Sequence, residues 1–241
     1  MGSTALPALL LITALVSGCT NYSAPVTSLA QPPSIQIVTH QVVAGDTLYS
    51  IAWRYDLDYR LLGSANGLRP PYRLEIGQVL SLDTSEAEPI VSARAASRSA
   101  AKSAKKPVGS KILEPPSTSS VSYSKDLRWQ WPVKGDIVED YNPKQLRKGL
   151  SIKTVSGSMV RPAAPGIVVY VGDGLRGYGK LIIIKHSDML LSAYAHNEKI
   201  VVNEGQQVKN TEIISKLGYK GTLYFEIRED GYPVNPKKYV E

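Results

Sequence analysis

The fold of the first part of the chain is decided by QVVAGDTLYSIA, residues 41–52. Residues 41–43 are a candidate strand, which stops at residues 44–46. Asp46 or Thr47 can then cap a helix, because apolar residues follow at the spacing of one helix face, at Leu48, Ile51, Ala52 and Tyr55. The stretch therefore predicts a short strand, a tight turn and an amphipathic helix.

A second helix and a closing strand are expected within the same fifty residues. Residues 59–65 form a short helix candidate that ends at Asn66-Gly67, a pair suited to a helix C-terminus. Residues 77–82 (GQVLSL) have the composition of a strand. The order is β-α-α-β, which predicts a small α+β domain over residues 37–83.

This unit resembles the LysM domain in residues 42–52, 66–68 and 76–80. The resemblance implies binding of N-acetylglucosamine-containing glycans, which in bacteria means peptidoglycan. An acetamido group needs one hydrogen-bond donor, one acceptor and an apolar surface for its methyl group, and loops can supply all three. The residues implied are Gly45, Asp46, Thr47, Leu48, Asn66, Leu68 and Ile76. The alternative for Gly45 and Asp46 is that they only form the turn and the helix cap.

Residues 127–241 are rich in strand candidates. Apolar runs recur about every ten residues with glycine turns between them, at 167–171, 181–185, 190–195, 213–217 and 223–228. This spacing predicts an all-β sheet or sandwich, with residues 182–184 in a central strand. A GxGxxG pattern at 172–177 is followed by a strand and not by a helix, so it predicts a hairpin loop and no dinucleotide site.

This second unit resembles the LytM or lysostaphin-type zinc endopeptidases, whose fold is of the duplicated hybrid motif type. The resemblance lies in WPVKG, KGL, AAPGIV, YAHN and LYFEIR, residues 131–135, 148–150, 163–168, 194–197 and 223–228. It implies four zinc-site positions, a His and an Asp four residues apart and a His-x-His pair. Here those positions hold Arg147, Ser151, Thr222 and Tyr224, and only the further His of the family, His196, is present.

The substituted positions argue against zinc chemistry. Catalytic zinc needs about three nitrogen, oxygen or sulfur ligands from the protein and an open position for water. Arg147 cannot act as a ligand because its guanidinium keeps its proton. His186 ends a strand and is expected to be structural. We therefore expect a degenerate peptidase domain with no metal, no cofactor and no catalytic residue.

The N-terminus has an apolar run of signal-peptide length, residues 6–17, too short to span a membrane. It ends in Val16-Ser17-Gly18-Cys19, which resembles a bacterial lipobox, although no Lys or Arg precedes the run. The resemblance implies a signal peptide over 1–18, lipid on Cys19, a tether over 19–36 and, from Thr20, an outer-membrane location facing the periplasm. The alternative for Cys19 is a buried free thiol.

Composition separates the two folded units and limits the partners. Residues 84–126 contain a run of Ala, Ser, Lys and Arg at 92–106 and lack large apolar side chains, which predicts a disordered linker. The 241 residues carry 28 Lys and Arg against 21 Asp and Glu, and this net charge of +7 without any basic block argues against nucleic acid. One Cys and three His exclude internal disulfides, Cys-type zinc fingers and iron–sulfur clusters.

The combination of lipobox, LysM, linker and LytM-type domain over residues 127–241 resembles the NlpD-like lipoproteins. The resemblance implies an activator of periplasmic N-acetylmuramoyl-L-alanine amidases in cell separation or envelope maintenance. It also implies a protein-binding cleft lined by Arg147, Ser151, Tyr194, His196, Thr222 and Tyr224. The alternatives are a zinc peptidoglycan endopeptidase and a passive anchor between outer membrane and cell wall.

Overall fold

The computed structural model describes residues 37–89 and 127–241, which lie in one structural unit from Ile37 to Glu241. The predicted signal peptide, Cys19, the tether and residues 90–126 of the predicted linker lie outside the described residues. In the part of the chain that is described, no helix is long and apolar enough to cross a membrane.

The N-terminal region has the predicted β-α-α-β order. Two strands, β1 (Thr39–Gln41) and β2 (Val79–Ser81), pair antiparallel with His40 opposite Leu80. Between them lie α1 (Leu48–Tyr55) and α2 (Tyr59–Ala65), and the bounds of α2 are those that the sequence predicts. The first strand begins two residues earlier than expected, so Val42 and Val43 follow it.

The cap of α1 is Thr47 and not Asp46. The Thr47 hydroxyl accepts a hydrogen bond from the Ser50 amide at 3.1 Å, and the Ser50 hydroxyl oxygen accepts one from the Thr47 amide at 3.0 Å. This reciprocal pair satisfies two amides that the helix itself leaves free. The Asp46 carboxylate instead accepts from the Val43 amide at 3.0 Å and lies 2.8 Å from His40 Nε2, so it tightens the turn before the helix.

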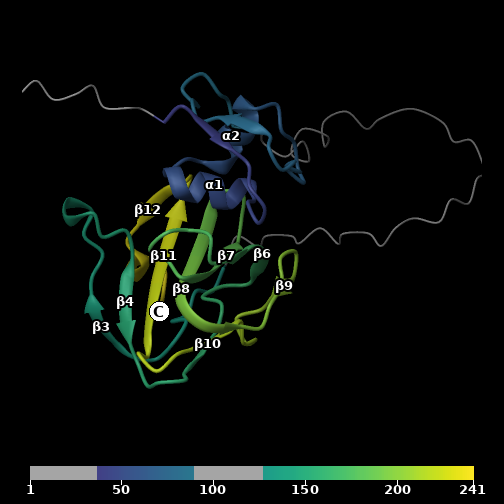
Figure 1. Ribbon diagram of the computed structural model, residues 1–241. Coiled ribbons are helices and arrows are strands. Elements are labelled where there is room, and N and C mark those ends of the chain that lie inside the picture. The colour runs from purple at the N-terminus through teal and green to yellow at the C-terminus, as the bar shows by residue number, and fades with distance from the viewer. Residues whose placement is uncertain (1–36, 90–126) are drawn as a thin grey trace, which may run out of the picture. The chain divides into compact units, whose positions relative to one another are not determined.

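The C-terminal region is an antiparallel sheet, as the spacing of apolar runs predicts (Figure 1). Its main order is β3-β4-β11-β8-β7-β6-β9, which places residues 182–184 on β7 in the interior of the sheet. The strands are β3 (Asp136–Glu139), β4 (Leu150–Lys153), β5 (Met159–Val160), β6 (Gly166–Gly172), β7 (Lys180–Lys185), β8 (Leu190–Ile200), β9 (Gln207–Val208), β10 (Ser215–Leu217), β11 (Thr222–Glu229) and β12 (Tyr232–Val234). The short 3-10 helices η2 (Pro143–Gln145) and η3 (Pro236–Lys238) lie in the connections.

Both faces of the central strands are buried. Successive side chains of a strand point to opposite faces, and on β7 Ile182 and Ile184 belong to one apolar cluster whereas Leu181 and Ile183 belong to another. The first cluster is the interior of the C-terminal region itself. The second also contains residues of the N-terminal region, among them Leu48, Ile51 and Trp53. This double burial explains why residues 181–184 are uniformly apolar and do not alternate with polar ones.

Candidate functional site: a glycan pocket and a filled peptidase cleft

A pocket of about 250 Å³ is lined by loops of the N-terminal region and by Val169 of β6. Asp46, Thr47 and Leu48 of the predicted glycan set line it. The other lining residues are Tyr49, Pro71, Tyr72, Leu74 and Val169. Apolar and aromatic side chains next to a few polar groups suit a sugar with an acetamido methyl. Tyr49 is adjacent to the predicted motif, whereas Pro71, Tyr72 and Leu74 lie in a loop to which the sequence assigned no role.

The remaining predicted glycan residues lie outside this pocket lining. Gly45 is exposed and adopts a φ of +85°, as a tight turn requires. The Asn66 amide is used internally: its Nδ2 donates to the Leu62 and Ser81 carbonyls and its Oδ1 accepts from the Ser81 amide at 2.7 Å. Leu68 packs against the apolar cluster, and Ile76 is exposed.

The positions that would hold zinc are brought together by three adjacent strands. Ser151 on β4 pairs with Tyr224 on β11, and Tyr224 pairs with Ala195 on β8, next to His196. The Tyr224 ring fills this space. A Cβ at Gly149 would lie 2.9 Å from Cζ and 3.0 Å from the hydroxyl of Tyr224, so the ring lies directly against the chain that follows Arg147.

Tyr224 belongs to a buried polar network on β11. Its hydroxyl donates to Glu226 Oε2 at 2.7 Å, and the Tyr178 hydroxyl donates to the same oxygen at 3.4 Å. The other oxygen of Glu226 accepts from Arg228 Nε at 2.7 Å. Burial, followed by the nearby Glu226 carboxylate, raises the pKa of Tyr178 to about 12 and that of Tyr224 further. Both phenols are therefore neutral donors at physiological pH.

His196 and Thr222 line a separate open pocket of about 540 Å³ with Glu198 and residues 218–221. His196 adopts a φ of +64° and is exposed, with Nε2 3.3 Å from the Gly177 carbonyl. Its ring centroid lies 6.1 Å from that of Tyr224. The structure thus places three of the predicted cleft residues, His196, Thr222 and Tyr224, side by side.

Arg147 and Ser151 flank this region. Ser151 is largely buried and its hydroxyl donates to Glu139 Oε2 at 2.7 Å. The Arg147 Nη2 donates to Gln145, whereas its buried Nε has no hydrogen-bond partner among the described residues. Arg147 is therefore the member of the predicted cleft set with unused donor capacity.

Tyr194 does not reach the cleft. It is fully buried in the interior cluster, and its hydroxyl accepts from the Ala163 amide at 2.7 Å and lies 2.8 Å from Ser192 Oγ. Strand alternation explains the difference, since Ala193 and Ala195 face the other cluster. His186 lies in the same interior, with Nδ1 2.8 Å from the Pro165 carbonyl and Nε2 2.6 Å from Ser192 Oγ. This agrees with the expected structural role of His186.

The residues at the zinc positions do not fit a zinc ion. They are a guanidinium, a serine hydroxyl that donates to Glu139, a threonine hydroxyl that donates to the Lys220 carbonyl, and an aromatic ring that packs on Gly149. Within residues 37–89 and 127–241, no group of three or more His, Cys, Asp and Glu side chains is placed to hold a metal.

Comparisons with known proteins agree with the two-domain arrangement. The model of the LysM domain matches residues 40–83, and that of peptidase family M23 matches residues 145–236. "Lipoprotein NlpD/LppB homolog" of Pseudomonas aeruginosa is 36% identical over 91% of this chain and 82% of its own length. "Murein hydrolase activator NlpD" of Salmonella typhimurium is 34% identical, over 84% and 68%. "Outer membrane antigenic lipoprotein B" of Haemophilus influenzae is 31% identical, over 91% and 68%.

Proposed function

Since this chain belongs to the NlpD/LppB family, we propose that it activates a periplasmic N-acetylmuramoyl-L-alanine amidase and has no peptidase activity of its own. The LysM domain (residues 37–83) holds peptidoglycan, and the M23 domain (residues 127–241) meets the amidase. The name "murein hydrolase activator" of the Salmonella relative supports this role. The activity belongs to cell separation or envelope maintenance, where murein must be cut under control.

The observation that carries the proposal is the filled zinc site. The model of peptidase family M23 matches residues 145–236, and three adjacent strands bring the expected positions together. The ligand positions, however, hold Arg147, Ser151, Thr222 and Tyr224, and the Tyr224 ring packs on Gly149 where an ion and its water would need open space. A retained cleft without ligands suits the binding of another protein.

The cleft offers chemistry for a protein partner. Arg147 can pair with a carboxylate of the partner, because its half-buried guanidinium keeps its charge. The open pocket lined by His196 and Thr222 has room for a side chain of the partner. We assign the contact with the amidase to this surface.

Attachment at two points, lipid on Cys19 and glycan bound by LysM, would bring the protein to its substrate. The pocket at Thr47 and Leu48 supports glycan binding by LysM, and lipid on Cys19 would hold the chain at the outer membrane, facing the periplasm. The relatives named as lipoproteins support this location. Tethering of this kind raises the effective concentration of activator at the cell wall.

Dye release from labelled peptidoglycan tests the proposal. The full chain is assayed with a purified periplasmic amidase, and each protein is also assayed alone, with and without added zinc. Stimulation of the amidase, with no release by the chain alone, is the expected result. Release by the chain alone would establish an endopeptidase, and no release by any mixture would leave a passive anchor.

A further inference from the structure

The LysM domain covers part of the M23 sheet. The outward side chains of β6, β7 and β8 form one apolar cluster with the core of LysM, and they are Tyr170, Leu181, Ile183, Leu191, Ala193 and Ala195. All six are at most 5% exposed. Without LysM they would form a continuous apolar surface, which soluble proteins keep for interactions.

The covered surface reaches the cleft through β11. Arg228 is 1% exposed, and its guanidinium carbon lies 3.9 Å from the centroid of the Trp53 ring of α1. Its Nη1 donates to the Trp53 carbonyl at 3.1 Å, and its Nη2 lies 2.9 Å from Asp56 Oδ1. Tyr224 and Tyr178, the neighbours of Arg228 in the buried network, pack against the same cluster. The C-terminal end of α1 therefore closes the Tyr224 side of the cleft.

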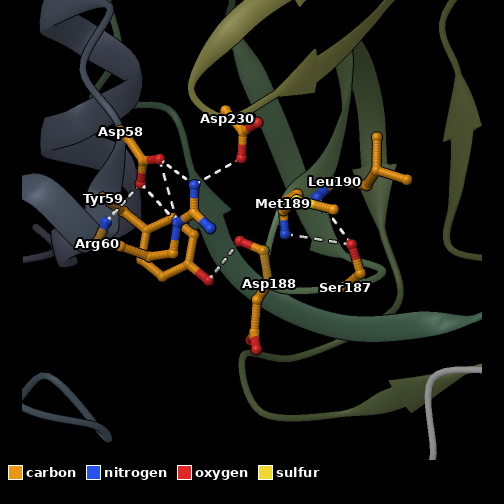
Figure 2. A network of polar contacts seen from close by, with 8 residues as sticks. All are labelled: Asp58, Tyr59, Arg60, Ser187, Asp188, Met189, Leu190 and Asp230. Atoms are coloured by element: carbon orange, nitrogen blue, oxygen red, sulfur yellow. Dashed lines mark hydrogen bonds and ion pairs between the residues drawn. The ribbon is translucent and has the colours of Figure 1, made fainter. Parts of the chain in front are cut away.

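Polar contacts surround this apolar centre. Arg60 bridges Asp58 of LysM and Asp230 of the M23 domain, and the Tyr59 hydroxyl donates to the Asp188 carbonyl at 3.0 Å (Figure 2). Lys148, the neighbour of Arg147, pairs with Asp56. The side chains of Lys148, Asp56 and Asp230 are between 35% and 49% exposed. Ion pairs this exposed contribute about 0–1 kcal/mol each, so the two domains are held together mainly by the apolar cluster and the Arg228–Trp53 contact.

We propose that LysM is an internal competitor for the M23 surface, and that it must leave the sheet before the amidase gains the whole cleft. This inference rests on the proposed function, because it regulates the same site. In the closed form the His196 pocket remains open, whereas Arg228 is covered by α1, and Tyr178 and Tyr224 pack against the cluster that LysM shares. The closed form is thus a weak activator and the open form a strong one.

One glycine marks where the two domains touch most closely. A Cβ at Gly231, in the turn between β11 and β12, would lie 2.6 Å from the Asp58 amide nitrogen and 2.7 Å from its Cα. Backbone cannot yield to such a contact, so Gly231→Ala acts as a wedge. Gly205 has the same φ of +82° and nothing within 4 Å of its Cβ position. Gly205→Ala therefore reproduces the backbone strain without the wedge and is the matched control.

Zero-length crosslinking reports the closed form directly. A carbodiimide joins an amine to a carboxylate that touches it, so Lys148 and Asp56 should couple in the full wild-type chain. The Lys237–Asp140 pair lies within the M23 domain and serves as the internal reference. We expect the Lys148–Asp56 product in wild type and in Gly205→Ala, and slower formation of it in Gly231→Ala with the reference product unchanged. The same three uncrosslinked chains are then compared in the amidase assay.

We expect Gly231→Ala to stimulate the amidase about three- to fivefold more than Gly205→Ala, the effect of about 1 kcal/mol on a closed–open equilibrium. Equal stimulation, or no Lys148–Asp56 product in wild type, would overturn the inference and leave the proposed function intact. No stimulation by any of the chains would overturn the proposed function, and the inference with it.

A second variant tests the same contact without changing the turn between β11 and β12. Arg60→Glu replaces the attraction to Asp230 by repulsion, and an acidic residue in the first turn of α2 is compatible with the helix. Arg69→Glu makes the same charge change at an exposed loop position of LysM. Slower formation of the Lys148–Asp56 product and higher stimulation are expected for Arg60→Glu alone. Identical behaviour of the two variants would contradict the inference.

Discussion

The guanidinium of Arg228 lies on the ring of Trp53, with 3.9 Å between its central carbon and the ring centroid, and Nη1 donates to the carbonyl of the same residue. A strand of the M23 domain and a helix of LysM are thereby joined through a buried cation. Glu226, fully buried, supplies the compensating charge at 2.7 Å. Asp56 of LysM lies 2.9 Å from Nη2 of the same guanidinium, so the charge of Arg228 is compensated from both domains, while its stacking surface comes from LysM.

Arg228→Lys tests whether the planar guanidinium contacts of Arg228, and not only its charge, stabilise the fold. An ammonium cannot stack on Trp53 while it also reaches Glu226 and the Trp53 carbonyl, so buried groups lose partners. We expect the free energy of unfolding to fall by about 2–3 kcal/mol, less than the roughly 3–5 kcal/mol for removing one partner of a buried pair, because lysine keeps the charge. Urea denaturation followed by circular dichroism measures the change. Arg161→Lys, at an exposed position, should leave the midpoint unchanged.

Tyr224→Phe keeps the ring that fills the cleft and removes its hydroxyl. Glu226 Oε2 would then retain only the longer 3.4 Å contact with Tyr178. An under-satisfied buried carboxylate costs about 1–3 kcal/mol, which urea denaturation would detect. Tyr219→Phe is the control, since Tyr219 is 83% exposed and lines the neighbouring pocket. A loss of similar size in both variants would contradict the role given to the Tyr224–Glu226 bond.

The fold could be predicted from local signals, whereas the relation of the two domains could not. Turn and cap residues such as Thr47 and Asn66 fix the β-α-α-β unit within fifty residues, and glycine turns mark the strands of the M23 domain. Residues 181–184 carried a further signal, a run with no polar face, which indicates burial on both sides. Nothing in that run says that the second covering surface is LysM, because contacts such as Trp53 to Arg228 join residues far apart in the chain.

Within the site, the sequence predicted which residues lie close together better than it predicted the face on which each side chain lies. The strand pairing does bring Ser151, Tyr224 and His196 together. Tyr194 was misplaced because one residue along a strand reverses the face on which a side chain lies. Leu74 and Tyr72 were missed as pocket residues because they lie in an irregular loop, for which spacing patterns give no indication.

Acid should destabilise the M23 domain through His186. Burial lowers the pKa of His186 to about 4 from its usual 6.5. Between these values the unfolded chain binds a proton that the folded chain does not, so stability falls as pH decreases from 6.5 to 4, by about 3 kcal/mol in total. The Pro165 carbonyl can only accept, so Nδ1 carries the proton of the neutral ring and Nε2 accepts from Ser192.

Denaturation curves between pH 4 and pH 8 check this assignment. The comparison is between wild type and His186→Gln, because carboxylates also titrate in the acid range and their effect cancels in the difference. The variant is expected to be less stable at pH 8 and to show a smaller loss of stability on acidification. Parallel pH profiles for the two chains would rule out His186 as the source.

The proposed glycan pocket allows a test of whether the residues that line it or the residues implied by the LysM resemblance bind the sugar. Leu74 lines the pocket, whereas Ile76 belongs to the set implied by the LysM resemblance but is 77% exposed and outside the lining. We expect Leu74→Glu to weaken binding of an N-acetylglucosamine tetramer at least about tenfold, or 1.4 kcal/mol, and Ile76→Glu to weaken it about twofold. Calorimetric titration of the full chain measures both. A larger effect at Ile76 would shift the site to the exposed edge of the loop.

Among the cleft residues, Arg147 is expected to contribute most to the free energy of binding the amidase. Its Nη2 donates to Gln145 and its side chain is half-buried, so a carboxylate of the amidase would pair with a guanidinium that is already partly desolvated. Removal of a charge-assisted bond of this kind costs about 1.5–3 kcal/mol. Arg147→Ala should therefore lower the affinity for the amidase by about ten- to hundredfold. Titration of the activator in the dye-release assay gives this affinity, with Arg161→Ala as the exposed control.

Because Arg147 lies outside the surface covered by LysM, the loss of affinity caused by Arg147→Ala should be equal in the Gly231→Ala background. A loss that disappears in that background would instead place Arg147 in the closure of the two domains.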